Sequence, residues 1–200
     1  MKKILVYPNK NLRIKTPEIL GIDKKLLLEI RDLSKVLEKG SNAVGLAATQ
    51  IGLQKRFFGI KDVESKKISI FLNPKIEKSY GEKVFPKVIK ESSADAADSA
   101  EASTAKEDFL EGCLSFPNYF GTAKRYLKLD VSWQEIGKDG LVKKFKTLDA
   151  FEAIVFQHES DHLDGIVFVD HVKEDGGKFY KAVEDKMILW DVEKVVNGKL

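Results

Sequence analysis

Two histidines and a glutamate within six residues are the part of this chain best suited to chemistry. Positions 157–162 read QHESDH, so His158 and His162 lie four residues apart. On an α-helix that spacing is one turn, about 6 Å along the axis, and both imidazoles can reach one cation. Glu159 projects about 100° around the helix from His158, where it can act on water as a general base. The pattern predicts a metal site with a base beside it; two histidines hydrogen-bonded in the core are the alternative.

Such a metal needs a third protein ligand and an open position for water. His171 follows His162 by nine positions, and Cys113 offers a thiolate, a strong ligand for transition metals, next to Gly112, which lets the backbone approach closely. We expect His171 to be an ordinary exposed histidine or one that supports a ligand from behind. A lone cysteine is most often a buried apolar side chain, so spacing alone leaves the third ligand open.

The two histidines need a helix to hold them, and the surrounding residues predict one. Thr147 followed by Asp149 is typical of a helix start, and the helix runs towards Gly165. The expected buried face continues at the same spacing into both imidazoles, and it consists of Leu148, Phe151, Ile154 and Val155.

Short apolar runs elsewhere predict strands. They lie at 56–60, at 68–72 before Asn73-Pro74, and at 127–136. The last run turns at Gly137-Lys138-Asp139-Gly140 into 141–145, which predicts a β-hairpin with a tight loop.

Two further amphipathic helices are expected towards the ends of the chain. Residues 23–40 carry an apolar stripe, with Asp23 able to cap the start and Gly40 the end. A last helix is expected from about 178 to 196. Together the elements predict a single α+β domain over 1–200, with mixed or antiparallel sheets packed around the metal-binding helix.

Composition narrows the class of protein. The chain has 200 residues, 43% of them apolar, and a net charge of +3, which suits one soluble domain and is too small to indicate nucleic acid or a membrane as the main partner. The single cysteine excludes an internal disulfide and fits a reducing compartment. The first residues lack the apolar core of an export signal, so we expect a cytoplasmic protein. Residues at about 88–108 form an insertion rich in Ala, Ser and acidic residues, expected to be a solvated loop or surface helix, or alternatively a partner-binding segment.

Three motifs in the same order give the chain a family resemblance. They read AVGLAATQ at 43–50, EGCLS at 111–115 and QHESDH at 157–162. The chain thereby resembles the peptide deformylases, which remove the formyl group from the amino-terminal formylmethionine of nascent proteins. The resemblance implies one divalent metal, ferrous iron (Fe²⁺) natively, replaceable by zinc, nickel or cobalt (Zn²⁺, Ni²⁺ or Co²⁺). It also implies formylmethionyl nascent peptides as partners, with the ribosome near the exit tunnel as a possible further one.

The resemblance also implies a role for each site residue. Cys113, His158 and His162 would hold the metal, and Glu159 would move the proton of the attacking water. The side-chain amide of Gln50 and the backbone N–H of Leu114 would stabilise the oxyanion. Glu111 and Arg125 would steady the Cys113 loop. The substrate residues would be Ala43, Val44, Gly45, Phe151, Ile154 and Val155, and Ala43 stands where the family motif begins with Gly.

Two other interpretations remain open on sequence. The His158–His162 motif alone also fits a zinc endopeptidase. The second is a non-catalytic binding module whose metal is structural or lost, in which the acidic insertion recruits a partner.

Overall fold

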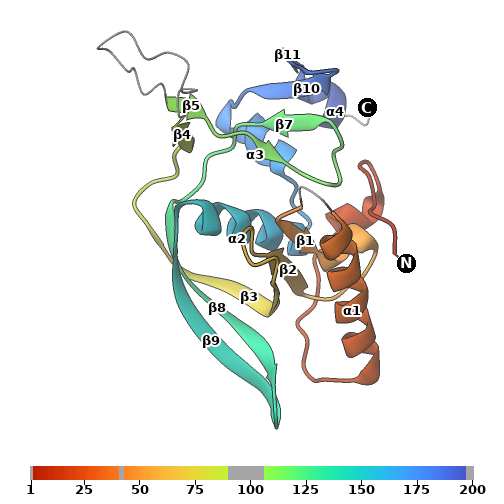
Figure 1. The fold of residues 1–200 in the computed structure, drawn as a ribbon. Helices are drawn as coiled ribbons and strands as arrows, with labels where there is room; N and C mark the ends of the chain where they lie inside the picture. Colours follow the sequence, from red (N-terminus) through yellow and green to blue (C-terminus); the bar gives the residue numbers. More distant parts are fainter. Residues whose placement is uncertain (1, 41–42, 90–105, 197–200) are drawn as a thin grey trace.

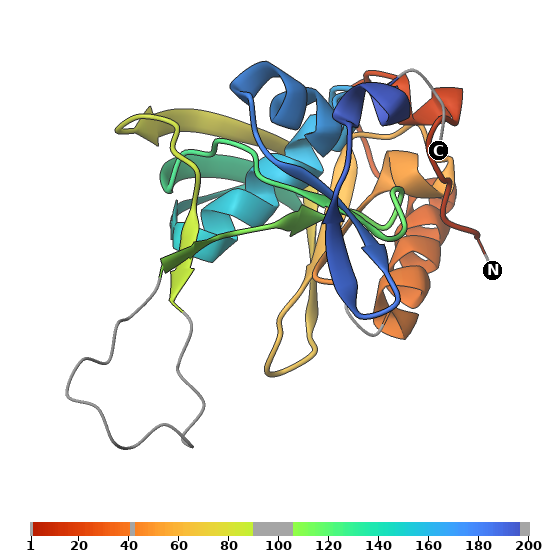
Figure 2. The same ribbon diagram turned by 90° about the horizontal axis from the view of Figure 1, so that it is seen from above.

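The computed structural model describes residues 2–40, 43–89 and 106–196. The predicted insertion at about 88–108 therefore lies mostly outside the described residues. Its flanks are the strands β4 (Lys87–Ile89) and β5 (Lys106–Asp108), which pair in an antiparallel two-stranded sheet at the opposite end of the molecule from α1 (Figures 1 and 2).

A five-stranded antiparallel sheet, in the order β1-β2-β3-β8-β9, forms the larger half of the fold (Figure 1). Its long β8–β9 hairpin curves away from the body of the molecule. The strands are β1 (Gly45–Ala47), β2 (Phe57–Lys61), β3 (Ile68–Tyr80), β8 (Lys128–Gly137) and β9 (Gly140–Asp149).

A four-stranded sheet in the order β11-β10-β7-β6 forms the other half, also antiparallel. Its strands are β6 (Glu111–Gly112), β7 (Tyr119–Gly121), β10 (Phe179–Val183) and β11 (Lys186–Leu189). Strands β1 and β6 are both outer strands of their sheets, which leaves one backbone edge of each unpaired among the described strands.

Helix α2 (Ala150–Leu163) lies between the two sheets (Figures 1 and 2). Successive residues of a strand point to opposite faces, and β2 uses this to bind a helix on each side. Phe57 packs with α1 (Lys24–Lys39), whereas Phe58 packs against Phe156 of α2. Burying each of these rings contributes about 1.5–3 kcal/mol. The sheet therefore fixes where α2 lies.

The remaining helices are short. They are η1 (Lys10–Arg13), η2 (Ala48–Ile51), α3 (Phe168–Asp175) and α4 (Val192–Val196). None of the described helices has the length and apolar character needed to cross a membrane.

The sequence predicts the central elements well. Helix α1 begins after Asp23, whose carboxylate accepts a hydrogen bond from the N–H of Leu26 at 2.6 Å, and ends at Gly40. The predicted hairpin is confirmed and is longer than expected, because β9 continues to Asp149.

The expected helix at 178–196 is wrong over most of its length. Residues 179–189 form the β10–β11 hairpin, and only Val192–Val196 is helical. Phe179 and Val183 are spaced by four, which is close to one helical turn but also an even number, so both residues also share one face of strand β10. Glu184, with φ 51°, makes the turn between the strands.

Three smaller expectations also need correction. Thr147 does not cap α2: it belongs to β9, and its hydroxyl donates to Asp130 at 2.7 Å. Phe151 is 44% exposed rather than buried, because α2 turns that side towards a cavity. Strand β3 passes through Asn73-Pro74 instead of ending there, since a register shift between Leu72 and Lys75 absorbs the proline.

Candidate metal centre and active site

Cys113, His158 and His162 converge on one point. One potential ligand atom from each lies within 4.8 Å of the others, and Sγ of Cys113 is 3.2 Å from Nε2 of His162. The histidines come from successive turns of α2, with ring centroids 5.0 Å apart. The cysteine follows β6, the outer strand of the smaller sheet. The site therefore joins residues from both halves of the fold.

The three side chains suit a divalent transition metal. A thiolate with two imidazoles is a donor set that such ions prefer. His162 is fully buried, and burial, together with the charge of His158, lowers its pKa to about 3. Its imidazole is therefore neutral, which is the form that binds metal. Nδ1 of His162 has no hydrogen-bond partner within the described residues, and Nε2 is directed at the cysteine.

His158 is oriented by a buried ion pair. Nδ1 of His158 donates to Oε2 of Glu111 at 2.9 Å, which fixes the tautomer and leaves Nε2 for a metal. Arg125 in turn donates two hydrogen bonds to Glu111, at 2.7 and 2.9 Å. Burial opposes ionisation of Glu111, but Arg125 and His158 outweigh it and hold the pKa of this carboxyl at about 2. The pKa of His158 is raised despite burial by its hydrogen bonds to Cys113 and Glu111.

Asp161 also contacts Arg125, and sequence reasoning did not find it. Its Oδ2 accepts from the guanidinium at 2.6 Å and from Nε2 of His171 at 2.9 Å. The signal was present in the sequence, because Asp161 stands beside His162 in the same motif. Burial raises the pKa of Asp161, but the hydrogen bond from His171 and the charge of Arg125 lower it to about 2.

Glu159 lies against Gly45 of β1. It is 4% exposed, and its Oε2 finds no hydrogen-bond partner among the described residues. Burial, reinforced by Asp161 and Glu111, raises its pKa to about 7. A carboxyl group that titrates near neutral pH can both accept and return a proton under ordinary conditions.

Gln50 and Leu114 lie beside the cysteine. The N–H of Ala47 donates to Oε1 of Gln50 at 2.8 Å, which turns the amide nitrogen towards Sγ of Cys113, 3.4 Å away. The N–H of Leu114 enters no hydrogen bond found between described residues. The chain's first residues support both loops, because Leu5 donates to the carbonyl of Gln50 and Tyr7 to that of Ser115.

A cavity of about 570 Å³ opens onto these groups. Cys113, His158 and Glu159 line it, whereas His162 and Arg125 do not. The six residues expected to contact substrate all line it: Ala43, Val44, Gly45, Phe151, Ile154 and Val155.

Comparison with known proteins decides the family. Residues 1–177 match the family described as polypeptide deformylase. The chain belongs to this family. It is 33% identical over 178 residues to a peptide deformylase of Aquifex aeolicus, an alignment that covers 86% of this chain and 88% of the relative. It is also similar to solved peptide deformylase structures. That of Plasmodium falciparum has 28% identity and a TM-score of 0.67, with 87% and 90% of the two chains covered. That of Thermotoga maritima has 28% identity and a TM-score of 0.65, with 86% and 97% covered.

This deformylase has aromatic residues at its cavity that sequence reasoning missed. Phe109 lies edge-to-face against Phe151 at 6.0 Å, and Tyr119 and Phe120 line another part of the wall. Phe109 precedes the motif at 111–115 by two positions, which was the only signal available in the sequence.

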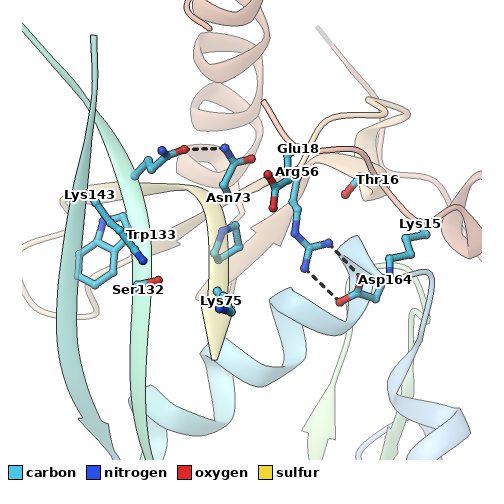
Figure 3. Close-up of a pocket in the computed structure, with 12 residues that line it drawn as sticks. Lys15, Thr16, Glu18, Arg56, Asn73, Lys75, Ser132, Trp133, Lys143 and Asp164 are labelled. Atoms are coloured by element: carbon cyan, nitrogen blue, oxygen red, sulfur yellow. Dashed lines mark hydrogen bonds and ion pairs between the residues drawn. The ribbon is translucent and has the colours of Figure 1, made fainter. Parts of the chain in front are cut away.

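A second hollow, of about 510 Å³, lies beside an ion pair at the carboxyl end of α2 (Figure 3). Arg56 donates to both carboxylate oxygens of Asp164, at 3.0 and 3.2 Å. Because Asp164 follows the last residue of α2, this ion pair anchors the carboxyl end of the metal-binding helix. Asn73 lies at the wall of the hollow, and its amide nitrogen donates to the backbone carbonyl of Ile19 and to Oε1 of Gln134. None of the three candidate ligands lines this hollow.

Proposed function

We propose that this deformylase hydrolyses the formyl amide of peptides that begin with formylmethionine. The observation that carries the proposal is the position of Glu159, a buried carboxylate that shares a cavity wall with Cys113 and His158, two of the three converging candidate ligands. In the reaction a C–O bond forms at the formyl carbon, the C–N bond breaks, and formate and a free amine leave.

The candidate ligands and Glu159 have separate roles in the proposed reaction. A divalent metal held by Cys113, His158 and His162 would supply Lewis acidity, which makes water nucleophilic near neutral pH. Glu159 takes the proton of the attacking water and delivers it to the departing amine nitrogen.

The developing negative charge on the formyl oxygen needs donors as well. We propose that they are the side-chain amide of Gln50, whose nitrogen lies 3.4 Å from Sγ of Cys113, and the backbone N–H of Leu114, the next residue in the chain. One such donor is worth roughly 3–4 kcal/mol in other hydrolases.

The two sheets favour a linear peptide as substrate. Val44, just before β1, Gly45, its first residue, and Gly112, on β6, line the same cavity. Because both are outer strands, an extended peptide can find backbone hydrogen-bond partners on either side. Ile154 and Val155 offer an apolar wall that suits an unbranched methionine side chain.

We propose ferrous iron as the native metal. A cysteine and two histidines accommodate it, while the Irving–Williams order lets zinc, nickel or cobalt replace it during purification. Protein purified without oxygen is expected to contain iron and to lose activity in air, and nickel or cobalt is expected to restore that activity. Failure of every divalent metal to support turnover would contradict the proposal.

The site of action follows from this substrate. Formylated chains are made by ribosomes, so we propose that the protein acts in the cytoplasm on nascent peptides near the exit tunnel. Cosedimentation of the purified protein with ribosomes at low and at high salt tests the second point, and recovery of all protein in the supernatant at both would contradict it.

Mass spectrometry of a formylmethionyl tripeptide separates this proposal from its rivals. Loss of the formyl group alone supports deformylation, and internal cleavage indicates an endopeptidase. An intact peptide with metal bound indicates a non-catalytic module. Glu159→Ala is the matched variant: it is expected to bind metal and to lower turnover by about 100-fold or more, and unchanged turnover would eliminate Glu159 as the base.

A further inference from the structure

Arg125 joins two carboxylates, and each carboxylate accepts a hydrogen bond from a different histidine. On one arm Glu111 contacts His158, a candidate ligand. On the other arm Asp161 contacts His171. The side chains of Arg125 and Glu111 are 3% exposed, whereas those of His171 and Asp161 are 12% and 20% exposed, so the network is buried at Arg125 and partly open at Asp161.

Arg125 donates hydrogen bonds to both carboxylates of the network. Nε and Nη2 of the guanidinium donate to Glu111, and Nη1 donates to Asp161, so the position of each carboxylate helps to fix the plane of the guanidinium. Oδ2 of Asp161 accepts from Arg125 and from His171. The hydrogen bond from the imidazole holds the carboxylate of Asp161 in place. Arg125, which contacts that carboxylate, then keeps its orientation and its two hydrogen bonds to Glu111.

His171 is not needed to attach its own helix. Phe168, Val169 and Val172 of α3 are buried, and Asp170 pairs with Arg13. The ring of Phe168 also stacks on that of His158 at 6.1 Å. With α3 held by these contacts, the hydrogen bond from His171 acts mainly on Asp161.

We propose that His171 is a positioning residue for the metal centre. It holds Asp161, so that Arg125 remains directed at Glu111, and Glu111 at Nδ1 of His158. The inference rests on the metal site of the proposed function and adds to it a residue that contacts neither metal nor substrate.

The test is the affinity of the protein for Co²⁺ alone, measured by competition with a chromophoric chelator at fixed pH. Removing a hydrogen-bond partner of a ligand costs about 10–100-fold in metal affinity, and His171 acts from farther away. We therefore expect His171→Leu and His171→Met to weaken Co²⁺ binding about 10-fold, the lower end of that range. His171→Gln, which retains an N–H at similar reach, is expected to restore affinity to within about threefold of the original protein. Lys173→Ala, on the same helix in a surface pair with Glu193, is the control and is expected to change nothing.

Three outcomes overturn the inference. Affinity within twofold of the original in the Leu and Met variants would do so, as would equal weakening in the Gln variant, which would indicate packing. Failure of both donor-free variants to fold would make His171 a structural residue. The proposed function fails separately, if the original protein binds Co²⁺ but releases no formate from a formylmethionyl peptide.

Discussion

Gly45 and Glu159 are in contact so close that no side chain fits between them. A β-carbon on Gly45 would lie 2.2 Å from Oε1 of Glu159 and 2.7 Å from its carboxyl carbon. The absence of a side chain at Gly45 therefore provides the space that the buried carboxylate of Glu159 occupies. Position 45 must therefore be glycine to leave room for the proposed base, and not because the backbone adopts a conformation that favours glycine there.

Gly45→Ala is accordingly expected to inactivate the enzyme without unfolding it. The new methyl group must displace Glu159, because the backbone of β1 is held by pairing with β2. General-base catalysis contributes about 100- to 10,000-fold, and we expect kcat for formate release to fall by at least about 100-fold with metal content retained. Gly21→Ala is the matched control, since a β-carbon there meets nothing within 4 Å. Normal kcat in the position-45 variant would show that Glu159 is not required in its present place.

Arg125→Met is expected to destabilise the protein and not only its metal site. The substitution leaves Glu111 and Asp161 buried without their cation, and breaking a buried ion pair in this way costs about 3–5 kcal/mol. Urea unfolding of the metal-free protein measures the effect. Lys173→Ala removes an exposed pair and is expected to cost at most about 1 kcal/mol. A similar loss in both variants would mean that the Arg125 network contributes little to folding.

The sequence predicts the three candidate metal ligands that the structure brings together, and it does so for a physical reason. The spacing of His158 and His162 defines a helical turn by itself, and the cysteine is recognisable from its motif. Asp161 and His171 could not be paired in advance, because their contact depends on how α3 packs against α2. Local periodicity says nothing about that packing.

The β10–β11 hairpin also shows that local periodicity alone does not determine structure. Phe179 and Val183 have a spacing that both a helix and a strand allow, so the tertiary partner decides. Phe179 pairs with Gly121 of β7, and that strand makes the segment extended. The cavity wall could be predicted only in part. Its α2 residues follow from the predicted helix, whereas the loop before β6 brings Phe109 to the cavity.

Phe151→Ala is expected to affect substrate binding more than chemistry. The ring is half-exposed at the cavity and contacts Phe109, but it lies outside the group of ligands and base. We expect KM for a formylmethionyl peptide to rise about 10-fold with kcat nearly unchanged, the result of losing binding common to the ground and transition states. Phe145→Ala, on β9 with a ring that is 67% exposed, is the control. A fall in kcat at constant KM would place Phe151 in the chemical step instead.

Glu77 on β3 is expected to make stability depend on pH in the acid range. The hydroxyl of Ser132, followed by Lys75 and Lys143, lowers the pKa of this carboxyl from about 4.5 to about 2. Because the folded pKa is the lower one, the ionised group stabilises the fold above about pH 4.5, and this contribution is lost as pH falls from 4.5 towards 2. The gap in urea midpoint between the original protein and Glu77→Gln should therefore be constant from pH 7 to 5.5 and narrow by pH 3.5. Glu64→Gln, in the exposed turn between β2 and β3, serves as the control and should show no such narrowing. A gap that is independent of pH would mean that the carboxyl group has the same pKa in the folded and unfolded chain.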